Sequence, residues 1–198
     1  WSGASYWFSF VALAKEAEVK LLGLRKDSLQ GDIAIVEIME NLGVKADFDA
    51  EGVLLTKNEV KGIGHIDFSN CPDLAQTVCV VLAVKGIACE MTGLESLRIK
   101  ETDRIAALQN EMGKFGGGIE EVSTGRWKLI PTVNSFSKLK SLRINTYEDH
   151  RMAMAFAILG LAKPGISIDE TLNIARQVAG VAGTGVEVAV VVGGGNIL

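Results

Sequence analysis

The 198-residue sequence has few of the residues that build metal centres or disulfide frameworks. It contains three cysteines, two histidines and three prolines. The cysteines, Cys71, Cys79 and Cys89, form no Cys-x-x-Cys pair, so they match neither a zinc site nor a disulfide-stapled secreted domain. An odd number of cysteines without metal spacing is typical of a reducing compartment, and we expect a cytoplasmic protein without a metal site.

Long apolar runs and an excess of positive charge are also missing. Charged residues interrupt every apolar stretch before about 18 residues, which argues against a membrane-spanning helix. The net charge is −4 and the pI about 5.3, so no basic field attracts nucleic acid. The first residues lack the form of a signal peptide and lead directly into an apolar helical pattern. We therefore interpret the sequence as a piece of a longer chain.

The sequence does contain a repeated pattern of elements. Hydrophobic residues make up 48% of it and the mean hydropathy is +0.26, which suits a globular lobe with a real core. Periodicity predicts a helix, a strand, a polar loop, a second helix and two strands. The same order of elements repeats about 70 residues later. A third copy begins near residue 150. The predicted ranges are 4–17, 18–24, 32–41, 45–49 and 52–56, then 73–84, 87–94, 103–114, 119–122 and 126–130, then 150–162 and 166–168.

These copies predict an α/β fold, built of repeated helix-strand-helix-strand-strand units around buried helices. The first helix of each copy is apolar nearly all round, so it should be interior, whereas the second is amphipathic and should lie outside it. Superposed copies align Gly23 with Gly93 and Gly43 with Gly116. A threefold repeat would bring the starts of the interior helices to one end of the lobe.

Charged residues gather in the loop before the second helix of copy two. Lys100, Glu101 and Arg104 lie at a helix start, where free N–H groups and the helix dipole favour anions. Arginine adds a planar fork that matches carboxylate or phosphate oxygens. A carboxylate among cations in a cleft is also a candidate proton shuttle. Helix capping by Asp103 and a solvated first turn are the alternative explanation.

A second charged cluster precedes the apolar helix of copy three. Arg151 near a helix start opposes the helix dipole, so it needs an anion nearby. Asp149 can serve as an N-cap, and His150 can be a hydrogen-bonded core histidine. The equivalent position of copy two is Asp73, which an N-cap would also explain. In copy one the serines Ser2 and Ser5 lie at that helix start. One face should therefore gather Ser2, Ser5, Asp73, Lys100, Glu101, Arg104, His150 and Arg151.

At these residues the sequence resembles the 5-enolpyruvylshikimate-3-phosphate (EPSP) synthase family. Leu-Arg-x-Lys-Glu-Thr-Asp-Arg at 97–104 and Asp-His-Arg-Met-Ala-Met at 149–154 are similar to two motifs of that family. So are Ser-Gly-Ala-Ser-Tyr-Trp-Phe at 2–8, Ser-Leu-Gln-Gly-Asp at 28–32 and Pro-Asp at 72–73. The sister family that acts on UDP-N-acetylglucosamine typically has Asp-Leu-Arg in place of Asp-His-Arg. The resemblance covers residues 1–170 and implies one lobe of a two-lobed enzyme whose substrates bind between the lobes.

The resemblance also implies a reaction and a role for each site residue. The family transfers the enolpyruvyl group of phosphoenolpyruvate to the 5-hydroxyl of shikimate 3-phosphate, without a metal or an organic cofactor. Asp73 resembles the proton acceptor for that hydroxyl, Lys100 a group that contacts it, and Glu101 the group that handles the methylene proton. Arg104 and Arg151 resemble arginines that bind phosphoenolpyruvate, with His150 and Ser2 beside the substrates. Expected partners are these two substrates and the enzyme's N-terminal lobe, and neither nucleic acid nor membrane.

The tail departs from the family. Residues 172–198 resemble a short stretch of bacterial uridylate kinase, with a helix at 172–182, a strand at 185–192 and a glycine-rich end. We therefore divide the chain into a lobe at 1–170 and an atypical tail at 171–198, which either completes the third repeat or is appended to it. Isolated, the lobe should be inactive. The alternatives are a non-catalytic anion-binding or engineered chimeric module, and, from the tail alone, a kinase fragment.

Overall fold

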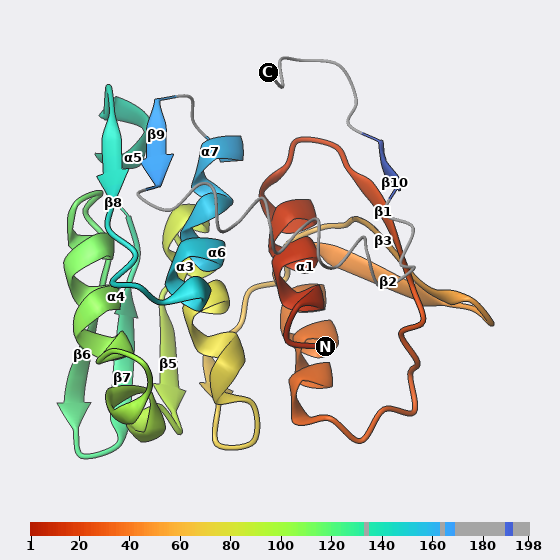
Figure 1. The fold of residues 1–198 in the computed structure, drawn as a ribbon, viewed down its shortest axis with the longest axis horizontal. Coiled ribbons are helices and arrows are strands. Elements are labelled where there is room, and N and C mark those ends of the chain that lie inside the picture. Colours follow the sequence, from red (N-terminus) through yellow and green to blue (C-terminus); the bar gives the residue numbers. More distant parts are fainter. Residues whose placement is uncertain (133–134, 163–164, 169–188, 192–198) are drawn as a thin grey trace.

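The computed structural model describes residues 1–132, 135–162, 165–168 and 189–191, which form three sheets around a group of central helices (Figure 1). The second repeat is the most complete. It runs through β4 (His65–Asp67), the short 3-10 helix η2 (Pro72–Leu74), α3 (Ala75–Lys85), β5 (Cys89–Thr92), η3 (Glu95–Ile99), α4 (Arg104–Gly113), β6 (Gly118–Ser123) and β7 (Arg126–Ile130). Its sheet has the order β4-β5-β7-β6, in which only the β4–β5 pair is parallel.

The first and third repeats follow the same plan. The first has α1 (Ala4–Leu13), β1 (Glu18–Leu22), η1 (Gly31–Ala34), α2 (Ile35–Asn41), β2 (Val44–Phe48) and β3 (Gly52–Lys57). The third has α5 (Ser135–Lys138), β8 (Leu142–Ile144), α6 (His150–Ala157), α7 (Leu159–Ala162) and β9 (Ile166–Ile168). Strands β8 and β9 pair in parallel, so β8-α6-β9 repeats the arrangement of β4-α3-β5. The first sheet, β10-β1-β3-β2, takes its edge strand β10 (Ala189–Val191) from the tail, antiparallel to β1.

The interior helix predicted for the second repeat is confirmed. In α3 the nine residues from Ala75 to Ala83 are all buried, because a helix that is apolar on every side is stable only when other elements surround it. Helix α4 instead buries one face, including Ile105, Leu108 and Met112. Figure 1 shows α1, α3 and α6 in the middle of the molecule with the sheets outside.

Two pairs of glycines confirm that the copies are equivalent. Gly23 and Gly93 have φ of 75° and 74°, and Gly43 and Gly116 have φ of 92° and 82°. Residues with a side chain rarely adopt this left-handed conformation, so each pair marks a turn that both copies require. The α/β fold with repeated units around buried helices is therefore confirmed.

Several predicted boundaries are wrong. The first helix ends at Leu13 instead of 17, because Ala14 is extended with ψ of 152°. The helix predicted over 150–162 is two helices separated at Ile158. Strands β4 and β8 were not predicted at all. The predicted tail helix at 172–182 lies outside the described residues, and of the predicted strand at 185–192 the structure describes β10. In the described part of the chain, no helix is both long and apolar enough to cross a membrane.

Candidate active site

The starts of four helices approach one another at one end of the molecule. In Figure 1, α1, α3, α4 and α6 all run upward, so their starts are at their lower ends. Hydrogen bonds between side chains at the starts of α4 and α6, and just before α3, join three of these ends directly. The predicted convergence of helix starts therefore brings together residues that lie up to 78 positions apart in the sequence.

Arg104 lies at the centre of this group. Its side chain is only 1% exposed, and three carboxylates surround its guanidinium. The Nε atom donates to Asp149 Oδ2 at 2.7 Å and Nη2 donates to Glu101 Oε2 at 2.6 Å. The Nη1 atom donates to Asp73 Oδ1 at 3.4 Å. A buried guanidinium with this many partners fixes the three carboxylates relative to one another.

Asp73 bridges two arginines instead of capping a helix. Its second oxygen accepts from Arg151 Nη2 at 2.8 Å, and its side chain is 29% exposed. Cys71 and Leu74 occupy the N-cap positions of η2 and α3, and neither helix start has a side-chain cap. The N-cap explanation for Asp73 is therefore wrong, and the anion that Arg151 was predicted to need is Asp73.

Asp149 combines a structural role with an electrostatic one. It is the N-cap of α6, where Oδ1 accepts from the backbone N–H groups of Arg151 and Met152 at 2.8 and 3.4 Å. Its other oxygen is the partner of Arg104, and the whole residue is 0% exposed. Asp103, by contrast, caps α4 at the surface by accepting from Ala106 N at 3.0 Å, as the capping explanation predicts.

The remaining predicted groups in this region line the solvent side of the network. Lys100, Glu101 and His150 are exposed, so their side chains can reach a molecule that binds there. A hydrogen bond from its own backbone N–H and the nearby Arg104 guanidinium hold the pKa of Glu101 below its ordinary value. Glu101 is thus ionised at neutral pH, as expected from its neighbours.

Ser2 lies apart from the arginine network. Its hydroxyl donates to Asp32, and it accepts from Gln30 Nε2 at 3.4 Å. Asp32 lies in the first turn of η1, where Gln30 occupies the N-cap position and no side chain caps the helix. Gly31 brings this loop against the segment before Asp73, since a Cβ there would lie 2.0 Å from Asn70 O.

Sequence reasoning missed Tyr6, which lies in the first turn of α1. Burial raises the pKa of Tyr6, whereas the adjacent positive charge of Arg151 lowers it. Tyr6 therefore contributes a hydroxyl to the surroundings of Arg151. The available signal was its position within the Ser-Gly-Ala-Ser-Tyr-Trp-Phe motif at 2–8.

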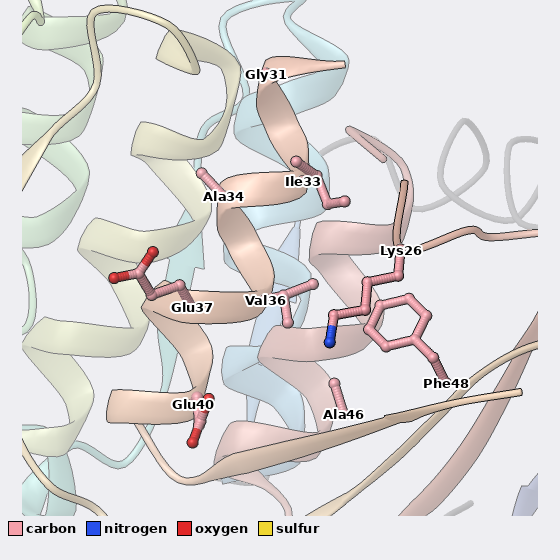
Figure 2. A pocket seen from close by; sticks show the side chains of 9 residues that line it. All are labelled: Lys26, Gly31, Ile33, Ala34, Val36, Glu37, Glu40, Ala46 and Phe48. Carbon is pink, nitrogen blue, oxygen red and sulfur yellow. The ribbon is translucent and has the colours of Figure 1, made fainter. Parts of the chain in front are cut away.

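The described residues also contain a cavity of about 430 Å³ beside α2, away from the predicted residues. Figure 2 shows the Lys26 side chain extending beside the ring of Phe48 at its rim. The cavity is lined by Lys26, Gly31, Ile33, Ala34, Val36, Glu37, Glu40, Ala46 and Phe48. Within the described part of the chain, no three His, Cys, Asp or Glu side chains lie close enough to hold a metal ion.

Comparison with known proteins identifies the family of the chain. Residues 1–178 match the family model of EPSP synthase (3-phosphoshikimate 1-carboxyvinyltransferase). A 3-phosphoshikimate 1-carboxyvinyltransferase of Bacteroides fragilis is 40% identical over 184 residues, which are 91% of this chain and 44% of that protein. One from Vibrio atlanticus is 35% identical over 170 residues, 85% of this chain and 38% of that protein. The chain thus spans less than half the length of these relatives.

Solved structures show the same fold. An EPSP synthase of Acinetobacter baumannii superposes with a TM-score of 0.65 at 20% identity, over 95% of this chain and 46% of that one. The enolpyruvyl transferase NikO of Streptomyces tendae superposes with a TM-score of 0.54 at 11% identity, over 98% of this chain and 44% of that one. With the match over residues 1–178, the chain belongs to the EPSP synthase family.

Proposed function

We propose that this chain is one lobe of an enzyme that transfers the enolpyruvyl group of phosphoenolpyruvate to the 5-hydroxyl of shikimate 3-phosphate. The observation that carries the proposal is the network of Asp73, Arg104, Asp149 and Arg151 at the meeting point of the helix starts. Burying charged groups together costs free energy unless they pair with one another or interact with a ligand. This network also lies beside exposed acid and base groups.

Asp73 is the proposed acceptor of the proton from the 5-hydroxyl. Two guanidinium groups contact it, one from Arg104 and one from Arg151. An anionic substrate that takes up Arg151 leaves the carboxylate with one cation fewer, which makes it a better proton acceptor. Binding of phosphoenolpyruvate would thus activate the base that the second substrate needs.

Glu101 is the proposed handler of the methylene proton of phosphoenolpyruvate. Its side chain is 54% exposed and its only described ion pair is to Arg104 Nη2. Arg104 is otherwise buried, so an incoming carboxylate or phosphate can reach its guanidinium by replacing Glu101. The hydrogen bond from its own backbone N–H and the charge of Arg104 both lower the pKa of Glu101. Displaced from the guanidinium, Glu101 loses the second of these effects and can more readily carry a proton.

Lys100, His150 and Arg151 are the proposed groups for the charged oxygens of the substrates, with Ser2 at the rim nearer α1. Lys100 and His150 are exposed, and the Arg151 side chain is 18% exposed. Cations fixed around a leaving phosphate stabilise the charge that develops on it, so no organic cofactor or metal is required in this proposal.

The proposed enzyme needs its other lobe. This chain spans 44% of the Bacteroides fragilis relative. We propose that residues 1–170 form the catalytic lobe and that 171–198 are a tail, which either completes the third repeat or is appended to it. Expected partners are the two anionic substrates and that lobe, in the cytoplasm. The test is a chimera in which residues 1–170 replace the matching segment of the Bacteroides fragilis protein, assayed for phosphate release.

We expect turnover by the chimera and no turnover by the isolated chain. The Asp73→Asn substitution should lower the turnover rate of the chimera by at least about a hundredfold. A folded chimera without activity would favour the alternative of an anion-binding module. Turnover by the isolated chain would contradict the two-lobe proposal directly.

A further inference from the structure

Glu111 is a buried carboxylate that the proposed chemistry does not use. It lies on α4, seven positions after Arg104, and is 0% exposed. Residues seven apart lie on the same side of a helix, two turns from each other. Both therefore face the segment that connects β8 to α6.

Helix α4 holds this segment at successive points. Glu111 accepts from the backbone N–H of Asn145 at 3.0 Å and from the Tyr147 hydroxyl at 2.7 Å. One turn further, Lys114 contacts the same carboxylate and donates to the Arg143 carbonyl at 3.1 Å. At the other end of the segment is the bond from Arg104 to Asp149. Four bonds from one helix face thus span positions 143 to 149.

The segment contains an unusual turn. Tyr147 and Glu148 have φ of 58° and 57°, and the N–H of Asp149 donates to the Thr146 carbonyl at 3.0 Å. Two consecutive central residues with positive φ are typical of a type I′ turn, which strongly prefers Asn-Gly. Tyr-Glu is strained in this conformation, so the surrounding contacts must maintain it.

The turn determines where α6 begins. Asp149 follows it immediately as the N-cap, and His150 and Arg151 are the first two residues of the helix. A change in the turn would shift the carboxylate that pairs with Arg104 and the guanidinium that pairs with Asp73.

We propose that Glu111 and Tyr147 are positioning residues, which hold the Tyr-Glu turn so that Asp149, His150 and Arg151 face the candidate active site. Their importance for catalysis rests on the proposed function, but the positioning itself does not. Burial and the hydrogen bond to Glu111 both raise the pKa of Tyr147, in agreement with a proton that stays on the phenol.

The test is amide hydrogen exchange of the 198-residue chain, followed by NMR, in wild type and Tyr147→Phe. This substitution keeps the ring and removes only the hydroxyl. We expect the protection of the Arg151 amide, which donates to Asp149, to fall about tenfold. The amide of Leu55 in the first sheet should be unchanged. A merely structural role would instead lower the protection of both amides together.

Two further measurements complete the test. The imidazole signals of His150 should move in Tyr147→Phe while those of His65, the other histidine, stay in place. Adding Glu148→Gly, which accepts positive φ without strain, should restore part of the lost protection.

Unchanged protection of Arg151 in Tyr147→Phe would overturn the positioning proposal, whatever the substrates do. Altered protection combined with no turnover by the folded chimera would instead refute the proposed function and leave the positioning intact.

Discussion

Removing one partner of the buried Arg104–Asp149 pair should be costly, because the charge of the other partner stays buried. We predict that Asp149→Asn lowers the free energy of unfolding by about 3 kcal/mol, the lower end of the cost of breaking a buried ion pair. Asparagine caps helices as well as aspartate does, and its amide oxygen can still accept one bond, so the loss comes from the missing charge. Both side chains are at most 1% exposed, so water cannot compensate.

Asp103→Asn is the matched control. Asp103 also caps a helix, but it is 41% exposed and its ion pair is with the half-exposed Arg98 at 3.6 Å. Surface pairs contribute about 1 kcal/mol or less, so this variant should stay close to wild type.

The assay is equilibrium unfolding in urea at pH 7. With a slope of about 3 kcal/mol per molar, typical of the larger single domains, Asp149→Asn should lower the midpoint by about 1 M. Equal midpoints for the two variants would refute the argument, because they would show that Arg104 gains nothing from the charge of Asp149.

Three other predictions follow from particular residues. Gly93→Ala should destabilise the chain by several kcal/mol, because the new Cβ would lie 2.2 Å from Ser69 N and the residue has a positive φ. At the equivalent Gly23 a Cβ would meet open space, so Gly23→Ala should lower the free energy of unfolding in urea by only about 1–2 kcal/mol. Burial raises the pKa of Cys71 to about 11, so alkylation by iodoacetamide at pH 8 should be much slower in the native chain than in urea. Folding lowers the pKa of Glu101, so its ionised carboxylate stabilises the native state above its ordinary pKa of 4.5, and this effect is lost as the pH falls. In Glu101→Gln the free energy of unfolding should therefore decrease less steeply as the pH is lowered into the acid range.

Elements with long regular patterns could be predicted from the sequence. The burial of α3 follows from its continuous apolar composition, and the repeat follows from glycines whose positive φ both copies need. Strands β4 and β8 have three residues each, too few for a periodic pattern to emerge. Their existence depends on the parallel partners β5 and β9, which come from elsewhere in the chain.

The members of the site could be predicted better than their partners. Charge at a helix start identified Arg151 and its need for an anion. The sequence cannot distinguish an aspartate that caps a helix from one that pairs with arginine, as Asp73 does. Glu111 gave no signal, since a glutamate on an amphipathic helix is usually exposed. The Tyr147-Glu148 turn carries no glycine, so only the structure reveals its left-handed backbone.

The central claim is that residues far apart in sequence form a single site for anionic substrates. Titration of the chain with phosphoenolpyruvate, followed through its two histidines by NMR, tests this most directly. We predict that the His150 signals shift saturably while those of His65 do not, and that Arg151→Ala abolishes the shift. Equal shifts of both histidines, or a His150 shift that survives Arg151→Ala, would contradict the account.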